Sequence, residues 1–277
     1  MPVFHRYVPH PPLSAFIEFF WLYEGECPAH RKERRLPDGS IELIFNLRDD
    51  QIRVYDRRDH DRYQTHSGSL ISGPQSSYAL LDTTILAGAM GVSFKAGGVL
   101  PFLPFPASEL HDQVLALETI WGAQVTDVRG QLGEAAIPAA RFAILEQFLL
   151  ERMALGRTSH PAVTGAAGIL NPAQDATCFP TIASAAAQIG LSQTRFVQVF
   201  REGAGMTPKQ FARLCRFQHV LSLLDAGGFA SWADIVVTCG YFDQAHLIHE
   251  FQAFAGLSPS LYLARRRQHR NHVPLLA

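Results

Sequence analysis

The C-terminal 120 residues contain an internal repeat, and this repeat restricts the chain to few folds. The stretch IASAAAQIGLSQTRFVQVFREGAGMTPKQF reappears in altered form as WADIVVTCGYFDQAHLIHEFQAFAGLSPSLY. Gly190 corresponds to Gly240, and after one extra residue in the second turn the copies keep a constant offset of 51 positions, as in Phe196 and Leu247. The chain therefore contains two copies of one supersecondary unit.

Each copy has the order of helix, glycine turn and second helix that defines a helix-turn-helix. Gly190 and Gly240 suit the turn, because glycine adopts left-handed backbone angles at little cost. A Ser, Thr or Asp precedes every expected helix and can cap it. The expected caps are Thr181, Ser192, Ser231 and Asp243, and the expected helices are 182–189, 193–201, 232–239 and 244–254.

A longer helix is expected between the copies, from Pro208 to Leu224, with Thr207 as its cap. Its apolar residues recur at steps of three and four, which is the helical period. They are Phe211, Leu214, Phe217, Leu221 and Leu224. A rigid helix packed on both copies would fix their separation, as is required of two units that enter successive major grooves about 34 Å apart.

The second helix of each copy has an apolar and a polar side. Phe196, Val199, Phe200, Leu247, Phe251 and Phe254 are expected to face inward, and Gln193, Thr194, Gln198, Gln244, Ala245 and His249 outward. Amides bond adenine and small apolar groups meet the thymine methyl, so the outward residues suit base reading. Two other interpretations stay open. The helices could form a bundle without DNA binding, or His246 and His249 could hold a metal, which would need further ligands.

The same stretches, over residues 160–266, resemble the DNA-binding domain of the AraC/XylS family of bacterial transcription regulators. The second stretch is the family's most diagnostic region, with Gly240, Phe242, Phe251, Gly256 and Pro259 in their expected places. The resemblance implies base contacts by Thr194, Val197 and Gln198 in the first reading helix, and by Gln244, Ala245, Ile248 and His249 in the second. Family members often carry Arg where this chain has His249, so the second helix is expected to bind more weakly or to prefer other bases.

The charge asymmetry between the two parts of the chain favours a nucleic-acid or membrane-surface partner for the basic part, and double-stranded DNA is the partner that we expect. From Thr158 onward 9 Lys and Arg oppose 6 Asp and Glu, a net charge of +3, whereas residues 1–157 carry 15 against 19, a net −4. Cations beside the reading helices can contact DNA phosphates. The expected phosphate contacts are Ser192, Arg195, Arg201, Lys209, Arg265 and Arg266.

The N-terminal part has a different pattern. Over residues 16–94, β-prone runs alternate with turn residues, as in LPDGSIELIFNL, which predicts an antiparallel barrel or sandwich. Helical patterns follow at 107–121, 125–132 and 138–153, and everything after His160 is expected to be helical. The predicted fold is α+β. It has a β-barrel-like, cupin-like domain with accessory helices over 1–155, a linker over 156–160, and an all-α domain over 161–277 in which a long helix joins the two units.

The stretches LPDGSIELIFNL, GVSFKAGGVLPFLPFPASELHD and IWG resemble a poorly characterised N-terminal domain found in a subset of these regulators. In better-known members an N-terminal barrel binds an effector and nearby helices dimerise. The resemblance therefore implies a small-molecule effector, whose binding residues stay unassigned, and RNA polymerase as a further partner. A homodimer is expected through the apolar stripe Phe142, Leu145, Leu149 and Met153. The cupin metal signature is absent, so neither a metal nor a cofactor is expected.

An enzymatic N-terminal domain is the alternative, because alkyl-transfer repair proteins also carry this type of helical domain. Such an enzyme needs an activated cysteine, and Cys27 has His30 three residues further on. No P-loop, nucleophile elbow or dinucleotide fingerprint is present. We therefore expect a regulator that is not an enzyme, controlled by an effector or, alternatively, by a protein partner. Without a secretory signal or an apolar run of membrane-spanning length, it is expected in the cytoplasm.

Overall fold

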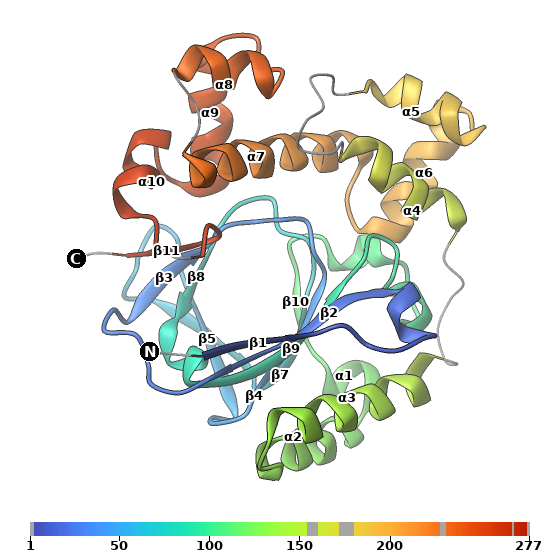
Figure 1. Ribbon diagram of the computed structural model, residues 1–277. Helices are drawn as coiled ribbons and strands as arrows, with labels where there is room; N and C mark the ends of the chain where they lie inside the picture. The colour runs from blue at the N-terminus through green and yellow to red at the C-terminus, as the bar shows by residue number, and fades with distance from the viewer. Residues whose placement is uncertain (1–2, 154–159, 172–179, 228–230, 268, 276–277) are drawn as a thin grey trace.

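The computed structural model describes residues 3–153, 160–171, 180–227, 231–267 and 269–275 (Figure 1). Two antiparallel sheets build the N-terminal part. The first has the order β1-β2-β9-β4-β7-β10, with strands Val3–Tyr7, Ile17–Glu24, Gly88–Phe94, Glu42–Asn46, Ser69–Ser72 and Val114–Ala116. The second has the order β11-β3-β8-β5-β6, with strands His272–Pro274, Lys32–Arg35, Ala79–Asp82, Gln51–Tyr55 and Tyr63–Ser67. The sheets face each other with a barrel-like outline, which confirms the cupin-like prediction.

Strand β4 shows how the sequence sets the two faces of the first sheet. It follows a turn in which Gly39 has φ 82° and the Asp38 carboxylate accepts from the backbone N–H of Ser40 at 3.0 Å. Side chains alternate along a strand. Leu43 and Phe45 are fully buried on the face that helices cover, whereas Glu42 faces the second sheet, where it pairs with Arg35.

Three helices cover the outer face of the first sheet: α1 (Glu118–Trp121), α2 (Gln124–Glu134) and α3 (Pro138–Met153). The α3 stripe is buried here, with Phe142 6% exposed and Leu145 and Leu149 fully buried among the sheet residues. The stripe was expected to form a dimer seam. Since the chain itself covers most of it, a homodimer would have to use another surface.

The predicted helix over 107–121 is wrong. This segment contains a short 3-10 helix (Ala107–Leu110), strand β10, which pairs with β7 at the edge of the sheet, and only then α1. Asp112 takes a positive φ of 54° between the first two, and its backbone N–H donates to the Pro74 carbonyl at 3.1 Å. Pairing with a distant strand overrides the local helical pattern.

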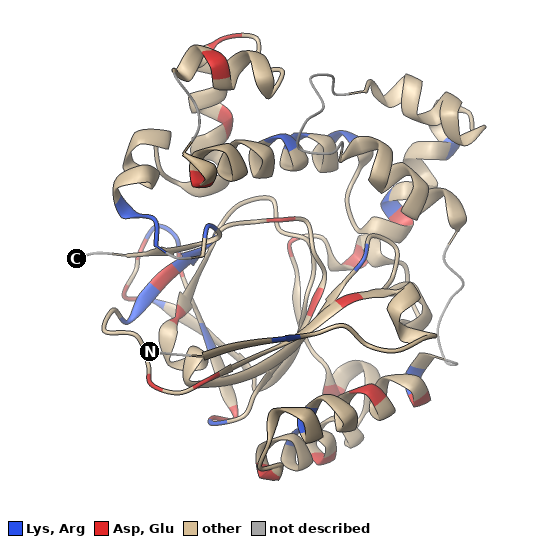
Figure 2. Ribbon diagram, in the orientation of Figure 1, with Lys and Arg blue, Asp and Glu red and all other residues tan. Residues whose placement is uncertain are grey.

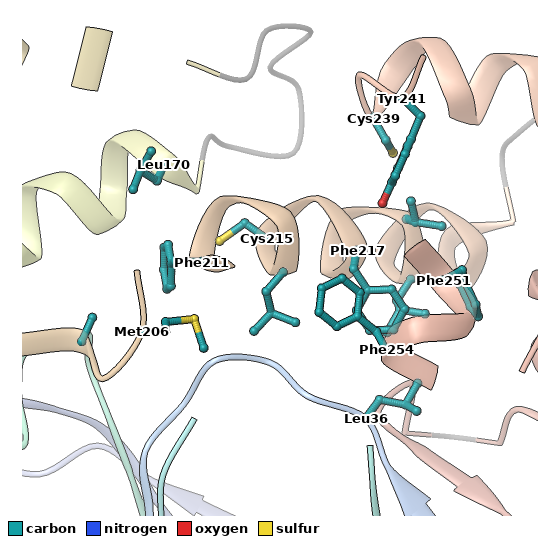
Figure 3. Close-up of a cluster of buried hydrophobic side chains, with 14 of the residues drawn as sticks. Leu36, Leu170, Met206, Phe211, Cys215, Phe217, Cys239, Tyr241, Phe251 and Phe254 are labelled. Carbon is teal, nitrogen blue, oxygen red and sulfur yellow. The ribbon is translucent and has the colours of Figure 1, made fainter. Parts of the chain in front are cut away.

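The remaining helices lie on one side of the two sheets (Figure 1). They are α4 (Pro161–Leu170), α5 (Ile182–Ile189), α6 (Gln193–Ala204), α7 (Pro208–Ala226), α8 (Trp232–Thr238), α9 (Gln244–Ala255) and α10 (Pro259–Arg265). Their core centres on α7, as Figure 3 shows. Phe211 of α7 packs on Phe200 of α6 with ring centroids 5.3 Å apart, and Phe217 of α7 packs on Phe251 of α9 at 5.2 Å. The connecting helix therefore holds both units, as its stripe predicts.

The last described element of the chain is not helical. After α10 the chain returns to the N-terminal part as β11, which extends the second sheet at the edge of β3. Leu36, just after β3, is buried in the helical core together with Val273 of β11. The expected linker over 156–160 lies outside the described residues except for His160, which caps α4. Within the described ranges, no helix combines the length and apolarity that a bilayer crossing requires.

Candidate DNA-binding surface

Helices α5 and α6 form the first helix-turn-helix. Thr181 caps α5, where its hydroxyl accepts from the backbone N–H of Ser184 at 3.1 Å. Gly190 ends that helix in the left-handed conformation, with φ 76°. Ser192 then caps α6 by accepting from the backbone N–H of Arg195 at 3.3 Å. All three roles were predicted from the sequence and are confirmed.

Helices α8 and α9 form the second unit by the same means. Ser231 caps α8, Gly240 makes the turn at φ 65°, and Asp243 caps α9 by accepting from the backbone N–H of His246 at 2.7 Å. Between the units, Thr207 and Gln210 form a reciprocal capping box at the start of α7. The predicted helix starts are therefore confirmed, and the helix ends differ by at most three residues.

The residues proposed to contact bases lie on the outer sides of α6 and α9. Their inward neighbours, Phe196, Phe200, Leu247 and Phe251, are at most 1% exposed. Gln193, Thr194, Gln198, Gln244, Ala245 and His249 are exposed, while Val197 and Ile248 are half-buried. The structure thus places these side chains where a ligand outside the protein can reach them.

The exposed side of α6 is already hydrogen-bonded along its length. Arg195 Nη1 donates to Gln198 Oε1 at 3.0 Å, and Gln198 Nε2 donates to Glu202 Oε1 at 3.1 Å. Reading a base with Gln198 would require this amide to exchange one partner for another. Because all three side chains are on the surface, water can take over the bonds at small cost.

The two histidines of α9 have different surroundings. His246 lies 3.7 Å from Glu250 through its Nε2, and its Nδ1 accepts from the Phe242 backbone N–H at 3.4 Å. His249 is exposed on the outer side. Among the residues that the structure describes, no group of three or more His, Cys, Asp or Glu side chains is arranged to hold a metal ion.

The residues proposed to contact phosphates differ in their exposure and in their hydrogen bonds. Arg195, Arg201 and Lys209 are exposed, and Ser192 uses its hydroxyl as a cap. Arg265 is half-buried. Arg266 donates through Nη1 to the Leu224 carbonyl at 2.6 Å and to Asp225 at 2.8 Å, so in this structure it fastens the end of α7 to α10. Arg266 would have to give up these hydrogen bonds in order to bind a phosphate through Nη1.

Sequence reasoning missed two arginines of the connecting helix. Arg213 and Arg216 follow Lys209 at helical steps of four and three, so all three lie on one face of α7. With His246 and Glu250 of α9 and Thr181 of α5, they line a groove of about 450 Å³ between the two units. The spacing was visible in the sequence, but the groove depends on how α5 and α9 flank α7.

A loop of the N-terminal part contacts both reading helices at equivalent points. Gly205 and Gly256, the matched left-handed ends of α6 and α9, have no room for a Cβ, because Pro74 and Tyr78 lie directly against them. Tyr78 also donates its backbone N–H to the Phe254 carbonyl at 2.9 Å. The 73–78 loop, between β7 and β8, therefore braces both units at once.

A charged cluster lies between the two sheets of the N-terminal part. Arg35 of β3 donates to Glu42 of β4 at 3.3 Å and to Asp38 at 2.8 Å, and Tyr23 of β2 lies close by. Burial opposes ionisation of Asp38, but the Arg35 charge and the Ser40 hydrogen bonds outweigh it and lower the Asp38 pKa to about 2. Burial raises the pKa of Glu42, against the attraction of Arg35.

The cysteine and histidine of the enzymatic alternative have separate partners. The Cys27 thiol donates weakly to the Thr84 carbonyl at 3.9 Å. His30 Nε2 lies 3.3 Å from Glu33, whose other oxygen is 2.6 Å from His272 Nδ1 of β11. In the described part of the structure, the thiol and the imidazole therefore each contact a different partner.

Comparison with protein families assigns both parts of the chain to known domain types. Residues 185–265 match a family described as a helix-turn-helix domain, and residues 5–116 match a domain of unknown function, DUF6597. The first match covers nearly all of both units. Among curated proteins, none matches the chain.

Among solved structures, the chain shows weak similarity to the following proteins. ToxT from Vibrio cholerae O395, bound to (E)-4-(8-methylnaphthalen-1-yl)but-3-enoic acid, is 12% identical with a TM-score of 0.47, covering 94% of this chain and 98% of that one. ToxT from Vibrio cholerae strain SCE256, bound to an unsaturated fatty acid, is 11% identical with a TM-score of 0.46, and the match covers 88% of this chain and 94% of that one. A DNA-binding transcriptional dual regulator from Escherichia coli K-12 is 24% identical with a TM-score of 0.33, and the match covers 39% of this chain and 96% of that one. Likenesses this weak do not transfer a ligand to this chain.

Proposed function

We propose that this chain, whose C-terminal part is an AraC-type helix-turn-helix domain, regulates transcription by binding a specific DNA sequence under the control of a small-molecule effector. It acts in the cytoplasm, where it reaches the chromosome. The observation that carries DNA reading is the matched pair of helices α6 and α9, each capped at its start and anchored to α7 by aromatic packing. Both point amide or small side chains outward from their first two turns, and such groups distinguish bases in the major groove.

Control by the N-terminal part rests on the 73–78 loop. Pro74 and Tyr78 contact the ends of α6 and α9, so a shift of this loop changes the position of both reading helices together. Two units read one duplex only when their separation matches the DNA repeat. An effector that moves the loop by a small distance therefore changes affinity for the paired site more than affinity for a single half-site.

The cluster between the sheets is the effector site that we propose. The Asp38 and Glu42 carboxylates and Arg35 offer acceptors and donors beside the 36–41 loop. This loop is a second contact with the helical part, separate from the 73–78 loop, because Gln218 Nε2 of α7 donates to the Pro37 carbonyl at 2.7 Å. Clustered ionisable groups with shifted pKa values mark functional sites more often than ordinary surface does. The chemical class of the effector is left open.

Selection of random duplexes with the full chain tests DNA reading. Enrichment of a sequence with two half-sites about 10 base pairs apart is expected, and binding to all sequences with equal affinity would contradict it. Thermal unfolding against a library of metabolites tests effector control, with Glu42→Gln as the variant that loses the response. Homodimerisation and contact with RNA polymerase are further proposals, and sedimentation of the full chain at micromolar concentration addresses the first.

A further inference from the structure

The groove between the two helix-turn-helix units collects positive charge on the side of α7 that faces away from the N-terminal part. Lys209, Arg213 and Arg216 line it together with His246, and Glu250 is the one acidic residue among the lining groups that the structure describes. The opposite side of α7 packs on the N-terminal part through Leu214, against Gly39, and through Gln218. Figure 2 shows basic residues along this helix, between α5 and α9.

Both arginines are held in place by the second unit. Arg216 donates through Nη1 to the Gly240 carbonyl at 3.2 Å, and its guanidinium lies 5.3 Å from the centre of the Tyr241 ring. Arg213 donates through Nε to Glu250 Oε1 at 2.6 Å. A guanidinium that is already oriented loses less entropy when it binds an anion than a free lysine does.

Glu250 leaves the anion-binding side of Arg213 unused. The carboxylate is 5% exposed, and its Oε2 has no hydrogen-bond partner among the described residues. Its bond to Arg213 uses Nε, whereas a phosphate is bound best by two parallel N–H groups of the guanidinium fork. Arg213 keeps 38% of its side chain exposed, so a phosphate in the groove can reach it.

The second reading helix needs cations that it does not carry. Helix α6 has Arg195 and Arg201, but α9 contains no Lys or Arg from Gln244 to Ala255. When two reading helices occupy successive major grooves, the duplex turns the phosphates on either side of its minor groove toward the surface between them. The basic face of α7 lies between α5 and α9, and so between the two units.

We propose that this groove binds phosphates of the DNA backbone between the two half-sites, with Arg213 and Arg216 as contacting residues. The inference rests on the proposed function, since it assumes that both units sit on one duplex. Arg213 and Arg216 supply the charge attraction that α9 lacks, while α9 itself reads bases. Each contact releases condensed counterions, and so contributes about 0.9 to the slope of log K against log salt.

The test measures that slope with the full chain on its selected duplex and on a random duplex. The variants are Arg216→Ala and the pair Arg213→Ala with Glu250→Gln, in which no buried carboxylate is left without its cation. Each is expected to lower the slope by about 0.9 and to weaken binding to both duplexes by the same factor. Arg62→Ala, which removes a charge from an exposed turn of the N-terminal part, serves as the matched control and should leave the slope unchanged.

Thermal unfolding of each variant shows whether it is folded, and a Lys replacement at either arginine gives a second measurement if an Ala variant is not. Lys keeps the charge, so the slope should persist while affinity falls. Folded Ala variants with an unchanged slope would overturn the groove assignment and leave the proposed function intact. Wild type that binds no duplex at low salt would instead remove the proposed function.

A small phosphate compound, such as a nucleotide, could bind the same arginines in place of the DNA backbone. Calorimetric titration with ATP in the absence of DNA separates the two sources. The proposal expects no saturable binding, because the groove is open and the duplex supplies many phosphates at once. Saturable ATP binding that disappears in the Arg213→Ala, Glu250→Gln variant would assign the groove to a nucleotide and overturn the DNA backbone assignment.

Discussion

The two helix-turn-helix units share their framework and differ in the surface they present. Caps, turn glycines and buried aromatics occupy matched positions, as in Phe200 and Phe251. The surface of α6 carries Arg195, Arg201 and Glu202, whereas the second unit exposes apolar groups. The residue inserted in its turn is Phe242, which is 90% exposed, and Val237 of α8 is 76% exposed. The caps, turn glycines and buried aromatic residues are therefore duplicated, whereas the exposed side chains that could contact a ligand differ between the units.

This difference indicates that the two units would contact DNA through different kinds of interaction. The first unit can combine amide contacts with charge attraction to phosphates. The second unit has Gln244 for hydrogen bonding and Phe242, Ala245 and Ile248 for apolar contact, which suits thymine methyl groups. Its charge is supplied from α7, by the arginines of the groove.

The largest expected effects test the shared framework. Phe200→Ala and Phe251→Ala each remove a fully packed ring from equivalent positions, so each should lower the free energy of unfolding by about 3–5 kcal/mol. Denaturant unfolding of the full chain measures both. A loss below about 1 kcal/mol in one unit, with the larger loss in the other, would show that the two units are not equivalent in packing.

A smaller effect tests whether both units read bases. Gln193→Ala and Gln244→Ala occupy the first position of their reading helices, and each should cost roughly 1–3 kcal/mol on the selected duplex and little on random DNA. The measurement is a competition gel shift. If Gln244→Ala weakens binding to both duplexes equally, its contact is to the backbone and the second unit does not read sequence there.

The smallest effect tests the apolar surface of the second unit. Replacing thymine by uracil in the second half-site removes a methyl group and should cost the wild type roughly 1 kcal/mol. The Phe242→Ala variant should bind the thymine duplex about 1 kcal/mol more weakly than the wild type does. Replacing thymine by uracil should not weaken the binding of this variant further. Uracil in the first half-site is the control. Equal losses from uracil in both half-sites would remove the distinction between the units.

Prediction from the sequence succeeded where the determinants are local. The caps Thr181, Ser192 and Asp243 and the glycine turns act within one helical turn, so their residue types suffice to position α5, α6 and α9. The stripe of α7 likewise identified the contact between the units. The same periodicity placed Gln193, Gln198, Gln244 and His249 on the exposed sides of their helices, and their contact with DNA stays a prediction.

The failures share a dependence on distant partners. Strand β10 forms because β7 offers an edge, and β11 forms because β3 does, yet neither pairing is encoded in the segment itself. The 73–78 loop acquires its importance only by contact with Gly205 and Gly256. The pairing of Arg266 with Asp225 likewise depends on the fold, and the predicted phosphate contact of Arg266 stays a prediction.

Footprinting of the full chain with hydroxyl radicals on its selected duplex tests the central claim most directly. If α6 and α9 occupy successive major grooves, two protected segments should appear on one face of the duplex, with centres about 10 base pairs apart. Gln244→Ala should weaken protection of one segment more than the other. A single protected segment in the wild type would contradict the account, because only one unit would then be bound to DNA.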